Sequence, residues 1–168
     1  MTVRATLACL LLAGAAMAVE LRPETLPGTG ITLHLPSAWQ TVLPAQGTTI
    51  RRRQVNGTAG VAISITRTTL GPAAFAQESL AELQRLAFEF ELLDWDFTRQ
   101  IRGRTWSRLH FRFVLGETRW EEQLWLTVDN GQAVAAAFSA RPAEWAAWAP
   151  VFEAALVGDG GSRPVLTR

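Results

Sequence analysis

The histidines and serines of this 168-residue chain are the first candidates for catalysis. Its two histidines, His34 and His110, lack the H-x-x-x-H or H-E-x-x-H spacing of a zinc site, and His110 stands between two arginines that would repel a cation. No G-x-S-x-G motif places a serine on the strand-to-helix turn that carries a hydrolase nucleophile. We interpret both histidines as structural or surface residues and predict no metal site.

Acidic residues near the middle of the chain offer a second kind of chemistry. A carboxylate pair of the glycosidase type could come from Glu89, Glu91, Asp94 and Asp96. The apolar residues of this stretch switch from one strand face to the other, which indicates a loop. We therefore interpret these carboxylates as solvated surface charges. The chain has no lysine, and its single cysteine is Cys9. These absences exclude a Schiff-base lysine and a P-loop lysine, so the sequence predicts neither enzyme activity nor a cofactor.

Arg51, Arg52 and Arg53 form the densest cluster of charge. They fall in a predicted strand, residues 48–55, where alternation places Arg51 and Arg53 on one face and Arg52 on the other. Burying an unpaired arginine is costly, so this strand should lie at a sheet edge or extend beyond the helices. The charges either prevent edge-to-edge aggregation or form a docking patch for an acidic partner or an anionic envelope surface.

Seven tryptophans suggest a further type of site. They could pack in the core, or they could line a groove for an apolar or anionic small molecule. The sequence also contains a glycosylation sequon, Asn56-Gly57-Thr58, which matters only in a eukaryotic secretory pathway. With 16 basic and 15 acidic residues, the chain lacks the basic excess of a nucleic-acid-binding protein.

The first 18 residues are typical of a signal peptide. A positive charge at Arg4 precedes an apolar run, and Ala16-Met17-Ala18 supplies the small residues that precede cleavage before Val19. The run is too short for a membrane span, which needs about 20 apolar residues. Cys9 lies too early for a lipid-modified cysteine. We therefore expect a periplasmic or secreted protein whose mature chain has no cysteine and no transmembrane span.

Residue patterns divide the mature chain into one domain and two flanks. Residues 19–29 are predicted to be an irregular lead-in, residues 30–158 a single domain and residues 159–168 a disordered tail. Alternation and turn signals predict strands at 31–35, 48–55, 60–68, 95–101, 105–115, 120–128 and 132–140, with a loop near Leu93 and Asp94. Helical spacing predicts helices at 73–88 and from Pro142 to Val157, the second kinked or restarted at Pro150.

The strands at 105–115 and 120–128 form a predicted hairpin with two distinct faces. It should place Arg112 near Glu121 and Arg108 near Trp125, whether the loop has two or four residues. The alanine-rich strand 132–140 should be central in the sheet, with close approach from both sides.

Several motifs, in their order along the chain, resemble the PsbP-like and DcrB-like domain family. They are Gly30–Pro36 followed by Trp39, the helix and loop of Leu83–Leu92, Gly103, the hairpin running from Gln123 through Asp129-Asn130-Gly131 to Ala137–Ala140, and the closing helix Trp148–Leu156. Two features depart from the family. Val157-Gly158 replaces the usual Ser-Phe after the last helix, and Cys9 does not fit the lipoprotein signal of several members.

This resemblance implies an α+β fold with a central antiparallel β-sheet flanked by helices, an α/β/α sandwich. Family members include photosystem assembly factors, a Ran-binding import factor, cell-envelope proteins and chaperones for secreted effectors. We therefore expect an exported, non-enzymatic binding or assembly module of the cell envelope with a protein partner. The alternative is a carrier of an apolar or anionic small molecule in a Trp-lined groove.

Overall fold

The computed structural model describes residues 19–44 and 47–158. The predicted signal peptide and the predicted tail at 159–168 lie outside these residues. The elements follow in the order β1 (Leu21–Thr25), β2 (Thr32–Pro36), β3 (Gln40–Thr41), β4 (Ile50–Arg53), β5 (Gly60–Arg67), α1 (Pro72–Leu86), β6 (Phe88–Ile101), β7 (Arg104–Leu115), β8 (Thr118–Asp129), β9 (Gln132–Ala140) and α2 (Pro142–Val157).

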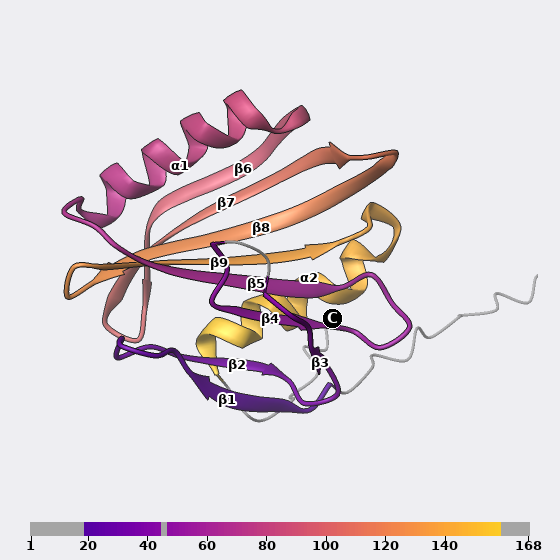
Figure 1. Cartoon of the computed structure of the whole chain (residues 1–168), viewed down its shortest axis with the longest axis horizontal. Coiled ribbons are helices and arrows are strands. Elements are labelled where there is room, and N and C mark those ends of the chain that lie inside the picture. Colours follow the sequence, from indigo (N-terminus) through magenta and orange to yellow (C-terminus); the bar gives the residue numbers. More distant parts are fainter. Residues whose placement is uncertain (1–18, 45–46, 159–168) are drawn as a thin grey trace, which may run out of the picture.

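The strands form a seven-stranded sheet and a separate two-stranded ribbon. The sheet has the order β3-β4-β5-β9-β8-β7-β6, and all its neighbouring strands are antiparallel. The ribbon pairs β1 with β2. Helix α1 covers one face of the sheet, whereas α2 and the ribbon lie on the other (Figure 1). The predicted α+β fold, a central antiparallel sheet flanked by helices, is confirmed.

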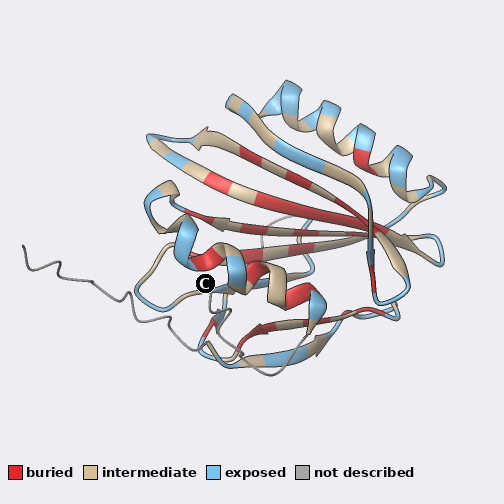
Figure 2. Ribbon diagram, turned by 180° about the vertical axis from the view of Figure 1, so that it is seen from behind, coloured by how far each residue is buried: buried red, intermediate tan, exposed pale blue. Residues whose placement is uncertain are grey.

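The larger hydrophobic core lies between the sheet and α2. Helix α2 buries Trp148, Phe152, Ala155 and Leu156 on one side, which Figure 2 shows as a buried stripe. The Trp148 ring lies 5.4 Å from the Trp39 ring, centroid to centroid. The predicted stripe of the closing helix is thus confirmed, and the helix runs through Pro150 without restarting.

A smaller core lies between the sheet and α1. It contains buried Ala76, Leu109, Phe111, Leu124 and Leu126. Helix α1 contributes partly buried residues at helical spacing, and most of its outer surface is exposed (Figure 2). The alternating side chains of β7 and β8 therefore supply both cores, one from each face.

Three tight turns fix the register of β6, β7, β8 and β9. Two-residue turns connect them, at Arg102-Gly103, Gly116-Glu117 and Asn130-Gly131. The resulting register pairs Arg112 with Glu121 and Arg108 with Trp125, as the sequence predicted.

Two predictions of local structure are wrong. Residues 21–25 form β1 rather than part of an irregular lead-in, because Pro23 is tolerated in an edge strand that pairs on one side only. Residues 88–101 form one strand rather than a strand after a loop at Leu93 and Asp94. Three register shifts along β6 absorb the change of phase, since each bulge lets the strand exchange faces without breaking.

The alanine-rich strand β9 is central in the sheet, as predicted. It pairs with β5 on one side and β8 on the other. Toward α2, Val134, Ala136 and Phe138 are fully buried. Toward α1, Ala135 and Ala137 are only half-buried at the margin of the smaller core. β9 is therefore fully covered on its α2 face and only marginally covered on its α1 face.

Candidate functional site

The three consecutive arginines lie on β4, next to the edge of the sheet. β4 pairs with β5 on one side and with the two-residue strand β3 on the other. Arg51 and Arg53 pair in register with Ala62 and Gly60, whereas Arg52 pairs with buried Val61. The position near the edge and the division between faces therefore agree with the sequence pattern.

Arg52 is used inside the fold. Its Nη2 donates to Glu24 Oε1 at 2.7 Å, and its Nε donates to Glu24 Oε2 at 3.2 Å. It also donates to the Thr41 hydroxyl. Glu24 belongs to β1, so this fork joins the ribbon to the sheet and neutralises the charge of Arg52. The side chain is therefore not available to a partner.

Arg51 and Arg53 remain exposed on the α1 side of the sheet. Among the described residues, neither forms a salt bridge, and Arg53 makes only a long hydrogen bond of 3.4 Å to the Gly57 carbonyl. Two uncompensated guanidinium groups therefore stand two residues apart on the same side of one strand.

The sheet beside these arginines carries only small side chains. Three register pairs across β5 and β9 join Gly60 to Ser139, Ala62 to Ala137 and Ser64 to Ala135, and all six residues are half-buried. Helix α1 packs on β6, β7 and β8 instead (Figure 1). We name this surface the open face, defined by Arg51, Arg53, Gly60, Ala62, Ser64, Ala135, Ala137 and Ser139.

Glu122 borders the open face and was missed by the sequence reasoning. It pairs in register with Phe111 and Ser139 and shares its face with Leu124 and Leu126. Desolvation raises the pKa of its carboxyl to about 7. Among the described residues, no salt bridge or hydrogen bond of this carboxyl is found. Its position in the apolar phase of β8 was the signal that could have identified it.

A second group of charges lies on the α2 side and has structural partners. Glu121 is 2% exposed and accepts from Arg112 Nε at 2.7 Å, while its other oxygen lies 2.8 Å from His110 Nε2. The hydrogen bond to Glu121 raises the pKa of Arg112. The His110 ring stacks on Trp145 of α2, with centroids 4.9 Å apart. These contacts fix the register of β7 and β8 and dock α2.

The carboxylates considered for glycosidase chemistry are paired along β6. Asp94 binds Arg108, Glu89 lies 3.1 Å from Arg119, and Glu91 lies 4.0 Å from Arg112. Asp96 accepts a hydrogen bond from the Thr98 amide at 2.9 Å instead. All four carboxylates are spaced along one strand, three of them in separate ion pairs. Among the described residues, no three His, Cys, Asp or Glu side chains are arranged to hold a metal ion.

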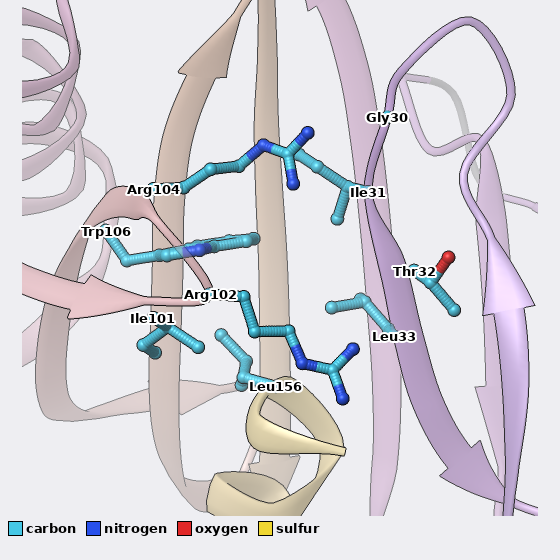
Figure 3. A pocket seen from close by; sticks show the side chains of 9 residues that line it. All are labelled: Gly30, Ile31, Thr32, Leu33, Ile101, Arg102, Arg104, Trp106 and Leu156. Atoms are coloured by element: carbon cyan, nitrogen blue, oxygen red, sulfur yellow. The ribbon is translucent and has the colours of Figure 1, made fainter.

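A small hollow lies between the β2 edge, the β6–β7 turn and the end of α2 (Figure 3). Its volume is about 110 Å³. Arg102 of the turn and Arg104 at the start of β7 extend toward β2, with the Trp106 ring between them (Figure 3). The remaining lining residues are Gly30, Ile31, Thr32, Leu33, Ile101 and Leu156.

The tryptophans do not gather around this hollow. Trp39, Trp106, Trp125 and Trp148 are buried in the larger core, and only Trp106 lines the hollow. Trp95 is 57% exposed on β6. Tryptophan in this protein therefore serves mainly to fill the core. Within the described part of the chain, no helix has the length and hydrophobicity needed to span a membrane.

Solved structures share this fold. The cyanobacterial PsbP from Synechocystis is 16% identical, with a TM-score of 0.62 over 87% of this chain and 95% of its own. LpqN, involved in cell envelope biogenesis of Mycobacterium tuberculosis, is 14% identical, with a TM-score of 0.57 over 83% and 88%. The Ran-binding protein Mog1p of Saccharomyces cerevisiae is 15% identical, with a TM-score of 0.51 over 80% and 84%.

No family model and no curated protein matches the sequence. The structural likeness confirms the predicted resemblance to PsbP-like domains at the level of the fold. At such low identity it carries no function with it, because one fold supports many unrelated functions.

Proposed function

We propose that this chain is an exported, non-enzymatic binding module that docks an acidic segment of a partner protein on its open face. The observation that carries the proposal is the pair Arg51 and Arg53, exposed and without salt-bridge partners among the described residues, beside half-buried sheet surface at the margin of the α1 core. The middle arginine of the cluster, Arg52, is paired with Glu24 and takes no part in docking.

Charge and shape both favour an acidic polypeptide as the occupant. Guanidinium groups bind carboxylates in forked, paired hydrogen bonds, which give geometric specificity as well as energy. The floor of Gly60, Ala62 and Ala137 has no long side chains, so a backbone can approach the sheet closely. A segment with two carboxylates spaced for Arg51 and Arg53 would satisfy both features.

A binding role is supported by the residues that could otherwise carry catalysis. Glu121 is bound to His110 and Arg112, and the His110 ring stacks on Trp145, so both residues have structural partners. Similar folds occur in Mog1p, a Ran-binding protein, and in LpqN, involved in cell envelope biogenesis. Those functions belong to the neighbours, and they illustrate that this architecture serves in protein binding and in the envelope.

Export is supported by the signal-peptide pattern before Val19. Val19, the residue that follows the expected cleavage site, packs against the larger core. The intact mass of the exported protein tests this point. A mass that begins at Val19 supports export and cleavage, whereas a product that retains residues 1–18 would contradict it.

The docking proposal is tested with charge reversal. The double variant R51E/R53E should lose binding of a short glutamate-rich peptide, followed by NMR shifts at Ala62 and Ala137. Its stability should stay within about 0.5 kcal/mol of wild type, as for other surface changes. A control variant, R67E/R85E, changes the same charge at exposed positions elsewhere and should bind normally.

Salt dependence provides an independent check. Added salt should weaken peptide binding, because the ionic contacts are at the surface and within reach of screening. Affinity capture from an envelope extract, with wild type, R51E/R53E and the control as parallel baits, then identifies the natural partner. Equal capture by all three baits, insensitive to salt, would refute docking on the open face and leave aggregation control as the role of these arginines.

A further inference from the structure

The hollow beside the β6–β7 turn combines an apolar interior with cationic groups at its opening. Leu33, Ile101, Trp106 and Leu156 line it with buried side chains, and the guanidinium groups of Arg102 and Arg104 extend over it (Figure 3). A single water needs about 10–15 Å³ of such space. At about 110 Å³, the hollow has room for a group of several heavy atoms.

Arg102 occupies a backbone position that arginine does not favour. The turn Arg102-Gly103 has positive φ at both residues, 51° and 75°, as a type I′ hairpin turn requires. The turn between β8 and β9 has the same signs at Asn130 and Gly131, 49° and 72°, and uses the preferred Asn-Gly pair. A strained backbone at an arginine directs attention to what its side chain does.

The charges around the hollow leave an excess of positive charge. Arg104 Nη2 lies 3.2 Å from Asp129 Oδ2, so this guanidinium is compensated. Arg102 is exposed and, among the described residues, has no carboxylate partner. Its Nη1 lies 3.5 Å from His34 Nε2, a contact that contributes no negative charge.

The end of α2 offers Arg102 a competing role. A side-chain carbon added at Gly158 would lie 2.0 Å from Arg102 Nη2, so the guanidinium rests directly on the helix C-terminus. The partial negative charge there is about half an elementary charge, less than the full charge of arginine. The helix end can therefore hold Arg102 in place and still leave it able to bind an anion.

The neighbouring strand exposes backbone groups on the same side. The Leu26 amide donates to the Ile31 carbonyl, and hydrogen-bonded pairs alternate along an antiparallel ribbon. Thr32 and His34 therefore direct their backbone amides away from β1, toward the free edge of β2. This edge could receive the backbone of an extended peptide.

We propose that the hollow binds a carboxylate that carries a short aliphatic chain. The chain enters between Leu33, Ile101 and Leu156, and the carboxylate lies against Arg102 at the opening. Such a group can come from a free carboxylic acid or from the C-terminal residue of a peptide laid along β2. The site is separate from the open face and does not depend on it.

Pentanoate, acetate, pentanamide and inorganic phosphate are the probes, followed by NMR shifts at Thr32 and Gly103 of the mature protein. Pentanoate should bind at least tenfold more tightly than acetate, because each buried methylene improves affinity about fourfold. Pentanamide and phosphate should bind at least tenfold more weakly than pentanoate. Equal binding of acetate, pentanamide or phosphate would overturn the proposal.

The variant R102N separates binding from folding. Asparagine fits the turn better than arginine, so R102N should unfold at a midpoint no lower than wild type and should bind pentanoate at least tenfold more weakly. R102K keeps the charge and should bind with an intermediate affinity. If R102N lowers the unfolding midpoint and leaves pentanoate binding unchanged, Arg102 serves α2 alone and the proposal is wrong.

Two further ligands identify the source of the carboxylate. An acetylated tetrapeptide ending in valine is compared with the same peptide amidated at its C-terminus. Binding tighter than pentanoate, and lost on amidation, would assign the site to a peptide terminus, while binding no tighter than pentanoate would assign it to a free acid. R51E/R53E should bind pentanoate normally, so failure of the open face and failure of the hollow are distinguishable.

Discussion

The guanidinium of Arg52 forms a fork with the carboxylate of Glu24, a residue 28 positions earlier in the chain. Both side chains are about three-quarters buried, with exposures of 23% and 24%. The pair connects the two-stranded ribbon to the main sheet on the side opposite the open face. It therefore explains why the middle arginine of three behaves unlike its neighbours.

A double-mutant cycle should detect this coupling. R52A and E24A should each lower the unfolding free energy, and their coupling energy should be roughly 1–2 kcal/mol, since a forked and partly buried pair exceeds the 0.2–1 kcal/mol of surface pairs. Urea denaturation of the four proteins measures it. The control is the exposed pair Arg22 and Glu20, whose Nε and Oε1 atoms lie 3.8 Å apart, and its coupling energy should be near zero.

The aromatic cluster beneath α2 should dominate stability. W148A and F152A should each lower the unfolding free energy by about 3–5 kcal/mol, because both side chains are buried among other rings and their removal leaves cavities. W95A is the matched control, since Trp95 is mostly exposed, and should cost less than about 1 kcal/mol. Unfolding midpoints of W148A or F152A equal to wild type would show that α2 does not dock.

Glu122 should make stability depend on pH. Its folded pKa, about 7, lies above the ordinary value of 4.5, so the fold favours the protonated form. Its contribution to stability is greatest below about pH 4.5 and is lost as pH rises toward 7, by roughly 1–3 kcal/mol. E122Q should therefore be more stable than wild type at pH 8, and the difference should shrink at pH 5.

The control for this titration is E82Q, which neutralises an exposed carboxyl on α1. Thermal unfolding of the three proteins between pH 4.5 and 8 measures the differences directly. If E122Q and E82Q shift stability equally at every pH, burial at Glu122 has no effect on its carboxyl.

Two glycines with the same backbone sign separate strain from crowding. Gly116 has φ 63° and space around it, whereas Gly158 has φ 67° and lies against Arg102 and His34. G116A should cost about 1–2 kcal/mol for the left-handed backbone alone. G158A should cost more, because the new methyl would collide with both side chains. Equal losses in chemical denaturation would indicate that Arg102 and His34 move aside freely.

Hairpins were the part of the fold best predicted from the sequence. Asn130-Gly131 and Gly103 are residue types typical of tight hairpin turns, so they indicate the turns directly. The alternation in β7 and β8 then determines which side chains meet. Arg112 and Glu121 follow from that register alone. Short-range chemistry and period-two patterning carry enough information for such elements.

Features that depend on distant contacts were not predicted. The residues around Arg52 give no indication that Glu24 is its partner. Pro23 argues against a strand in the sequence, and β1 forms there because it pairs with β2. The hollow is similarly invisible in the sequence, because β2, the β6–β7 turn and the end of α2 meet only after the sheet has formed. The bulges of β6 illustrate the same limit, because a switch of apolar residues between strand faces is equally consistent with a bulged strand and with a loop.

The packing of α2 on β2 has a consequence for the order of biosynthesis. The helix comes at the end of the domain and the strand near its beginning, so the larger core lacks one wall until nearly the whole chain has emerged. The larger core cannot close early, because the stabilising contacts between α2 and β2 join residues more than a hundred positions apart in the sequence. Nearly all of the domain must therefore be synthesised before α2 can pack on β2 and complete the larger core.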